Sequence, residues 1–122
     1  MLNKNFYQVT NTQETDGGIV LTIQFNAQHK IFEGHFPNQP VVPGVCTLQI
    51  IKEQLSQQLQ QPIVLREAAQ VKYLNTITPA QAPIVNFTIL YHVHETNISV
   101  TATITDGAVT YCKARLVFTT NV

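Results

Sequence analysis

The 122-residue sequence is poor in charge. Only 11% of its residues are Asp, Glu, Lys or Arg, against about 25% in an average soluble domain. Seven basic and seven acidic residues cancel, so the sequence has neither the basic surface that nucleic acid requires nor a polybasic membrane patch. A surface with so few charges favours burial of part of it in an oligomer.

Paired cysteines and long apolar runs are absent as well. The two cysteines, Cys46 and Cys112, stand without C-x-x-C spacing, which argues against a zinc knuckle or a redox pair and predicts two buried thiols. No apolar run is long enough to span a membrane, and the N-terminus lacks the apolar core of a signal peptide. We therefore expect a cytoplasmic protein. The length predicts a single domain over residues 1–122.

Alternating apolar and polar residues predict most of the chain to be strands. Residues 19–26 alternate behind a Gly-Gly turn, and a short strand over residues 6–9 is expected before them. Four segments after Pro62 are rich in β-branched and aromatic residues: 63–77, 82–94, 96–105 and 108–120. Turn residues separate the last three, which predicts an antiparallel meander.

A helix is expected between these two sets of strands. From Gly44, apolar residues recur at steps of three and four, which predicts a helix that is buried at its start and ends before Pro62. The apolar positions are Val45, Leu48, Ile51, Leu55 and Leu59. A helix on an antiparallel sheet of five to six strands is an α+β fold whose exposed edges dimerisation would cover.

The loop before the helix is unusually stiff. Residues 34–44, GHFPNQPVVPG, hold one histidine, His35, among three prolines and two glycines. Each proline fixes φ, and the residue before it is held extended. Such a loop suits a catalytic side chain, which must be held in place. A simple stiff connector is the alternative.

The start of the helix adds a second candidate. Pro43 falls near the first helical turn, and Gly44 leaves the backbone N–H groups uncovered by a side chain. The positive end of the helix dipole lies there, so a thioester or carboxylate oxygen would be stabilised as in an oxyanion hole. A plain helix start is the alternative.

The segment GHFPNQPVVPGVCTLQ resembles the signature of 3-hydroxyacyl-ACP dehydratases of the FabZ and FabA type, G-H-F-P-x-x-P-V-x-P-G-V-L-x-x-E, in the hot-dog fold. The resemblance extends to the strand over 18–27, the helix, the segment QVKYLNTITPA at 70–80 and the closing hairpins. It implies a long helix wrapped by a curved antiparallel sheet, with two subunits paired edge to edge. The partner would be a second copy or a related hot-dog chain.

The resemblance also implies a reaction. A hydro-lyase of this family removes water from a 3-hydroxyacyl group on acyl carrier protein and leaves a trans-2-enoyl thioester, in fatty-acid, polyketide or polyene biosynthesis. His35 would take the α-proton, a role that suits an imidazole with an ordinary pKa of about 6.5. Gly44 would donate its N–H to the thioester carbonyl. Neither a cofactor nor a metal is implied, because base, acid and oxyanion site suffice.

Further residues are expected at the substrate. Lys72 and Tyr73 would form the tunnel mouth where the phosphopantetheine arm enters. Lys72, Lys113 and Arg115 are candidates for contacts with the acidic carrier. The remaining contacts with substrate are expected from Phe36, Pro43 and Val45.

The sequence departs from the family at its acid. That position holds Gln49, which has no proton to give, and loss of a general acid costs roughly 10²- to 10⁴-fold in rate. Glu53 lies about 5.4 Å, one turn, further along the same helix face. Three interpretations stay open: Glu53 supplies the proton, a partner subunit supplies it, or the chain acts on acyl thioesters in another way, as a thioesterase or an acyl-binding protein. A solvated Glu53 without a role is the plain alternative.

Overall fold

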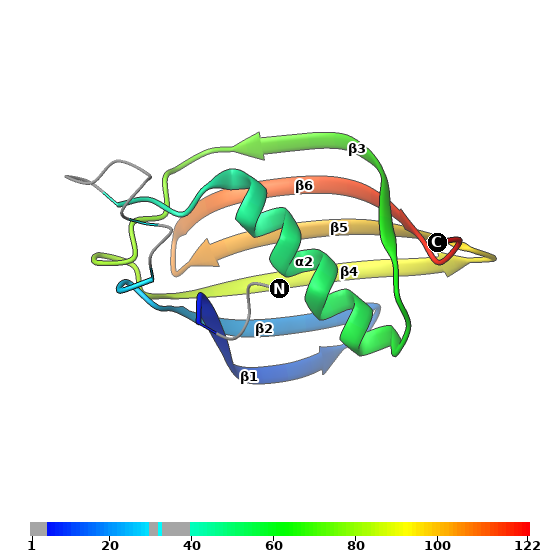
Figure 1. The fold of residues 1–122 in the computed structure, drawn as a ribbon, viewed down its shortest axis with the longest axis horizontal. Coiled ribbons are helices and arrows are strands. Elements are labelled where there is room, and N and C mark those ends of the chain that lie inside the picture. The colour runs from blue at the N-terminus through cyan, green and yellow to red at the C-terminus, as the bar shows by residue number, and fades with distance from the viewer. Residues whose placement is uncertain (1–4, 30–31, 33–39) are drawn as a thin grey trace.

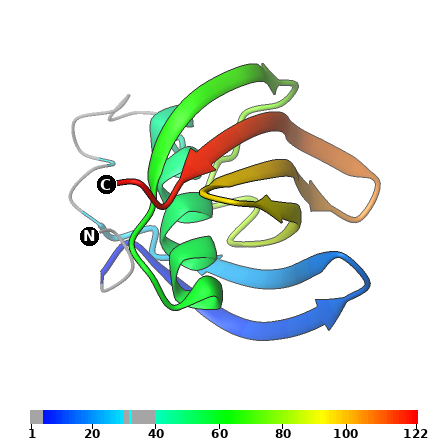
Figure 2. The same ribbon diagram turned by 90° about the vertical axis from the view of Figure 1, so that its right-hand side faces the viewer.

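The computed structural model describes residues 5–29, 32 and 40–122. In this part of the chain, helix α2 (Gly44–Leu59) lies against a curved six-stranded antiparallel sheet with the order β1-β2-β4-β5-β6-β3 (Figures 1 and 2). The strands are Tyr7–Thr15 (β1), Gly18–Phe25 (β2), Val64–Tyr73 (β3), Ile84–His94 (β4), Asn97–Asp106 (β5) and Val109–Thr119 (β6). The expected α+β architecture is confirmed.

Strand β1 is longer than the sequence predicts. The expectation of a short strand at residues 6–9 is wrong, because β1 runs on to Thr15 and pairs with β2 along its whole length. Its second half is polar and exposed, so it lacks the apolar alternation that marks a strand in sequence. A register shift between Val9 and Asn11 interrupts the pairing.

Strands β4, β5 and β6 form the expected meander. Each pairs antiparallel with the next. Strand β3 follows α2 in the chain but lies at the far side of this meander, paired with β6. Strands β1 and β3 are therefore the two edges of the described sheet.

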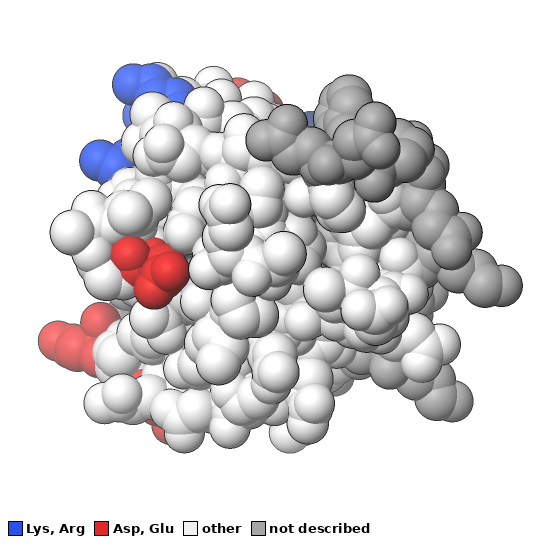
Figure 3. Space-filling view, turned by 90° about the vertical axis from the view of Figure 1, so that its left-hand side faces the viewer, with Lys and Arg blue, Asp and Glu red and all other residues white. Residues whose placement is uncertain are grey.

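The face of the sheet turned away from α2 carries basic side chains at the β3 edge. Lys72 on β3 lies opposite Lys113 on β6, and Arg115 follows two residues later. Cys112 and Ala114 on β6 are buried, so the alternate residues Lys113 and Arg115 point outward. Figure 3 shows Lys and Arg side chains gathered in one corner, with acidic side chains below them.

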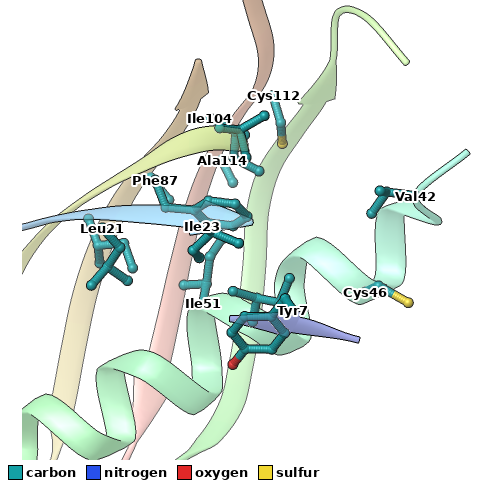
Figure 4. Packing of buried hydrophobic residues seen from close by; sticks show 14 of the residues in the cluster. Tyr7, Leu21, Ile23, Val42, Cys46, Ile51, Phe87, Ile104, Cys112 and Ala114 are labelled. Carbon is teal, nitrogen blue, oxygen red and sulfur yellow. The ribbon is translucent and has the colours of Figure 1, made fainter. Parts of the chain in front are cut away.

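The core lies between α2 and the sheet (Figure 4). Both cysteines are buried there, as predicted, and burial raises the pKa of each thiol. The largest fully buried side chains are Phe6, Phe87, Phe118, Ile19, Leu21, Ile23, Ile50, Ile51, Leu55, Ile89, Ile98 and Ile104.

No helix of the described residues is both long and apolar enough to cross a membrane.

The predicted buried face of the helix is partly wrong. Val45, expected inside, is 72% exposed. A solvated Glu53 was the plain alternative, but this residue is only 7% exposed. The helix faces the sheet with Cys46, Thr47, Ile50, Ile51, Glu53, Gln54 and Leu55. Successive helical residues are about 100° apart, so a face centred on Ile50 and Leu55 turns Val45 outward.

Candidate functional site

The structure separates the predicted site residues into two groups. Gly44 and Tyr73 meet at the start of α2, whereas Gln49 and Glu53 pair one turn further along. His35 and Phe36 lie outside the described residues.

A cavity of about 370 Å³ lies at the start of α2. It is bounded by the first turn of the helix, the end of β3 with the loop after it, and the start of β6. Its lining residues are Val41, Val42, Pro43, Gly44, Thr47, Tyr73, Leu74, Asn75, Thr76, Ile77, Tyr111 and Cys112. The predicted oxyanion donor Gly44 and two predicted substrate contacts, Pro43 and Tyr73, are thus brought together. Lys72 and Val45 are not among the described residues that line it.

Tyr73 packs directly against Gly44. A Cβ added at Gly44 would lie 2.6 Å from Cζ and 2.8 Å from the hydroxyl oxygen of Tyr73, closer than real Cβ atoms come, so this approach requires glycine. Burial raises the pKa of the Tyr73 hydroxyl, although a hydrogen bond with Thr47 opposes that shift. The residue stays 53% exposed, so Tyr73 forms a wall of the cavity that solvent reaches.

The first turn of α2 is held by a side chain from within the helix. The hydroxyl of Thr47 donates to the carbonyl oxygen of Gly44 at 2.6 Å. Pro43 is the N-cap residue, and in the described part of the chain no side chain caps the helix start. The Cys46 N–H donates to the Pro43 carbonyl oxygen at 3.0 Å, and Gly44, the first residue of the helix, lines the cavity. A helix start without a capping side chain beside a cavity suits the binding of a carbonyl oxygen.

A polar cluster lies beneath β1, on the sheet side of α2. It consists of Tyr7, Gln49, Glu53 and Gln54, and we call it the Tyr7 cluster. The Tyr7 hydroxyl donates to Oε1 of Glu53 at 2.9 Å, and Gln49 Nε2 donates to Oε2 of the same carboxylate at 3.0 Å. Gln54 Nε2 donates to the Tyr7 oxygen at 3.0 Å. Glu53 is thus a buried acceptor at the centre of the cluster.

Burial has an electrostatic effect on Tyr7. It raises the pKa of the Tyr7 hydroxyl well above its usual range, and the adjacent Glu53 raises that pKa further, while the hydrogen bond from Gln54 lowers it. Tyr7 therefore keeps its proton and donates it in a hydrogen bond to Glu53. Within the described residues, every buried side-chain nitrogen and oxygen atom has a hydrogen-bond partner.

Sequence reasoning missed Tyr7, Gln54 and Thr47. Gln54 falls four residues after the buried Ile50, so helical spacing places it on the sheet-facing side. Tyr7 alternates with Val9 on β1 and is buried at the start of a mostly exposed strand. The contact of Tyr7 with Glu53 joins residues 46 positions apart, which no local pattern predicts.

Comparison with solved structures identifies the fold. A chain of the dehydratase heterocomplex ApeI:P from Xenorhabdus doucetiae superposes with a TM-score of 0.73 at 14% identity, covering 92% of this chain and 96% of that one. A putative thioesterase, yhdA from Lactococcus lactis, superposes with a TM-score of 0.69 at 11% identity, covering 98% of this chain and 94% of that one. An uncharacterised protein from Erwinia carotovora subsp. atroseptica superposes with a TM-score of 0.70 at 20% identity, covering 95% of this chain and 96% of that one. The chain has the hot-dog fold.

The family follows from the sequence. Residues 10–113 match the ApeI-like family model, described as ApeI dehydratase, and the chain therefore belongs to the ApeI-like family. No curated protein matches its sequence. The narrower resemblance to the FabZ and FabA type stays a prediction.

Proposed function

We propose that this chain is a dehydratase subunit that acts on 3-hydroxyacyl groups carried by acyl carrier protein. The observation that carries the proposal is the match of residues 10–113 to a dehydratase family. His35 takes the α-proton, the carbon–oxygen bond at C3 breaks, and the hydroxyl group leaves as water after accepting a proton from an acid. The product is a trans-2-enoyl thioester.

The cavity at the start of α2 supports this chemistry. An enolate oxygen develops on the thioester when the α-proton leaves, and backbone N–H groups held in position stabilise that charge. The uncapped first turn at Gly44 supplies such donors beside a cavity of about 370 Å³. Tyr73 narrows the cavity where the thioester enters.

The acid comes from a partner subunit in this proposal. Gln49 has no proton to give. Both carboxylate oxygens of Glu53 accept hydrogen bonds, from Tyr7 and from Gln49, and its side chain is buried. These bonds favour a hetero-oligomer over Glu53 as the acid. The similar chain from Xenorhabdus doucetiae belongs to a dehydratase heterocomplex.

Strand β3 is the proposed site of pairing. It is an edge strand with exposed apolar side chains, among them Val64 and Leu65, and the strongly exposed Val45 lies on the neighbouring helix. An exposed apolar edge strand pairs readily with another strand. Pairing there would extend the sheet into the partner.

The basic corner at Lys72, Lys113 and Arg115 is the proposed landing site for the acidic carrier. It lies on the same two strands, β3 and β6, that contribute Tyr73 and Cys112 to the cavity. A carrier bound there is attracted by three like charges. Its phosphopantetheine arm would then enter beside Tyr73.

The test is dehydration of a 3-hydroxyacyl thioester, followed as enoyl product. The chain is assayed alone and together with the hot-dog subunit that co-purifies with it, beside His35→Ala and Gln49→Glu. We expect turnover with the partner, its loss in His35→Ala, and a gain of at least tenfold for the isolated Gln49→Glu chain, because a general acid contributes roughly 10²- to 10⁴-fold. Release of free thiol without enoyl product would instead identify a thioesterase.

A further inference from the structure

The polar side chains in the wall of the cavity differ in what they are bound to. The amide of Asn75 donates to the carbonyl oxygen of Thr110 at 2.8 Å, and the Tyr111 hydroxyl is hydrogen-bonded to the carboxylate of Asp106. These bonds tie both side chains to the β5–β6 hairpin. Tyr73 is instead half-exposed, and its hydroxyl lies at the start of α2, where the cavity is.

Thr47 fixes the Tyr73 hydroxyl relative to the first turn of α2. The side chain of Thr47 is buried, and its hydroxyl donates to the carbonyl oxygen of Gly44 at 2.6 Å. The same Thr47 hydroxyl is hydrogen-bonded to that of Tyr73. A phenol hydroxyl has one donor and two acceptor positions, and its hydrogen rotates to meet an acceptor. One bond to Thr47 therefore holds the Tyr73 oxygen in place and still allows its hydrogen to turn to a ligand.

The helix start supplies a second donor close to this hydroxyl. Among the described residues, no acceptor is found for the backbone N–H of Gly44 or Val45, as is usual in the first turn of a helix. A Cβ added at Gly44 would lie 2.8 Å from the Tyr73 hydroxyl oxygen. Because Cβ and the amide nitrogen share one Cα, that nitrogen lies within about 5.5 Å of the Tyr73 oxygen. An acceptor lies about 2.9 Å from each donor, so one oxygen atom can accept from both.

The Tyr73 hydroxyl keeps its proton at neutral pH. The pKa of a tyrosine hydroxyl is ordinarily about 10, and burial raises that of Tyr73. The hydrogen bond with Thr47 acts in the opposite direction but is the smaller effect. Tyr73 is therefore a neutral hydrogen-bond donor beside the Gly44 amide, and it can stabilise a negative oxygen without repelling it.

We propose that the Tyr73 hydroxyl donates a hydrogen bond to the carbonyl oxygen of the substrate thioester, together with the N–H of Gly44. The proposal rests on the proposed function, which places the thioester in this cavity. When the α-proton leaves, negative charge develops on that oxygen, and hydrogen bonds to a charged oxygen are stronger than those to a neutral one. Tyr73 therefore favours the transition state more than the bound substrate. A phenylalanine would form the same wall without this hydrogen bond.

The first experiment measures the hydrogen bond in a complex that cannot lose water. The chain, together with the hot-dog subunit that co-purifies with it, binds butyryl N-acetylcysteamine thioester carrying a heavy-carbon label at its carbonyl. Difference infrared spectra give the stretching frequency of that carbonyl, which each hydrogen bond lowers. We expect a lower frequency in the unsubstituted protein than in Tyr73→Phe. Tyr91→Phe removes a hydroxyl from strand β4, outside the cavity, and is the matched control that should keep the lower frequency.

The second experiment separates a donor from a wall residue by kinetics. Dehydration of a 3-hydroxyacyl thioester is followed with the same pair of subunits. We expect Tyr73→Phe to lower kcat roughly 100-fold or more, the effect of removing one donor from an oxyanion hole. KM should change little, because the interaction is made mainly in the transition state. Tyr91→Phe should change neither constant.

The outcomes separate this proposal from the proposed function. An equal carbonyl frequency in the unsubstituted protein and in Tyr73→Phe would overturn the hydrogen bond from Tyr73. A Tyr73→Phe variant with a raised KM and an unchanged kcat would also overturn it, because Tyr73 would then only shape the cavity. Both results leave the proposed function intact, since the thioester is still bound or turned over. Failure of the unsubstituted pair to bind either thioester would overturn the proposed function and the role of Tyr73 with it.

Discussion

The two edges of the sheet differ in what their side chains contact. Strand β1 is bound to α2 by hydrogen bonds, from Tyr7 to Glu53 at one end and from Gln58 to Glu14 at the other. Its exposed second half is polar, and its pairing has one register shift, whereas that of β3 has two. Strand β3 is regularly exposed and keeps apolar side chains such as Leu65, 42% exposed, in contact with solvent.

This difference assigns different tasks to the edges. Exposed polar side chains protect an edge strand from pairing with other chains, so β1 closes the sheet. An edge that keeps apolar side chains exposed is suited to pairing, so β3 is the edge that we expect to meet a partner. Changes at one edge should therefore leave the property of the other intact.

The largest effect is expected from a charge on β3. Leu65→Glu places an unpaired charge in the proposed interface, and an uncompensated buried charge costs about 3 kcal/mol or more. Subunit association should weaken on the order of 100-fold, as measured by sedimentation. Gln13→Glu puts the same charge on β1 and should change nothing. Equal association of both variants would contradict the assignment of β3.

The next effect concerns one tyrosine at each edge. Tyr7→Phe removes a donor from Glu53 and an acceptor from Gln54 inside the protein, so the free energy of unfolding should fall by about 1–3 kcal/mol. Tyr73→Phe changes a half-exposed residue and should cost less than about 0.5 kcal/mol. Urea denaturation with an unchanged m value measures both. Similar losses would show that the Tyr7 cluster contributes no special stability.

Gly44→Ala tests the contact between the start of α2 and Tyr73 at the end of β3. The new Cβ would displace the Tyr73 ring and move it into the cavity, so acyl thioester binding should weaken roughly tenfold. The free energy of unfolding should change little, because alanine favours the helix by about 1 kcal/mol over glycine and this gain offsets the cost of displacing the ring. Adding Tyr73→Ala removes the clash and should restore much of the binding. Binding unchanged in Gly44→Ala would place the substrate elsewhere.

The smallest effect is expected from the basic corner. Arg115→Glu reverses one exposed charge, and such charges contribute up to about 1 kcal/mol, so affinity for the acidic carrier should fall about 2- to 5-fold at low salt. The difference should vanish as salt screens it. Lys52→Glu, on α2, makes the same change away from this corner and should have no effect. Titration calorimetry at two ionic strengths checks this.

Local pattern predicted the elements well and their neighbours only partly. The meander β4–β6 follows from alternation and turn residues, and α2 from apolar spacing between Gly44 and Pro62. Strand β3 pairs with β6, so Tyr73 lies opposite Cys112 although the two residues are far apart in the sequence. Strand pairing at such separation depends on the whole sheet, so periodicity within β3 could not reveal it.

The site was predictable where its residues are adjacent in sequence. The Pro43–Gly44 pair at a helix start indicates amide donors by itself. Tyr73 as a wall of that cavity was suggested by the resemblance, and its contact with Gly44 came from the fold. The Tyr7 cluster was not predicted, because nothing near Glu53 in sequence reveals a tyrosine 46 positions earlier.

By itself, the sequence determined where the helix and most strands form, because spacing acts within a few residues. Only the tertiary structure decided that Val45 faces outward and Glu53 inward. Which side of a helix is buried depends on the sheet that it meets, and here β1 carries a hydroxyl to the place where Glu53 arrives. Helical spacing alone does not decide whether Glu53 is solvated, and the fold makes its carboxylate the centre of a buried cluster.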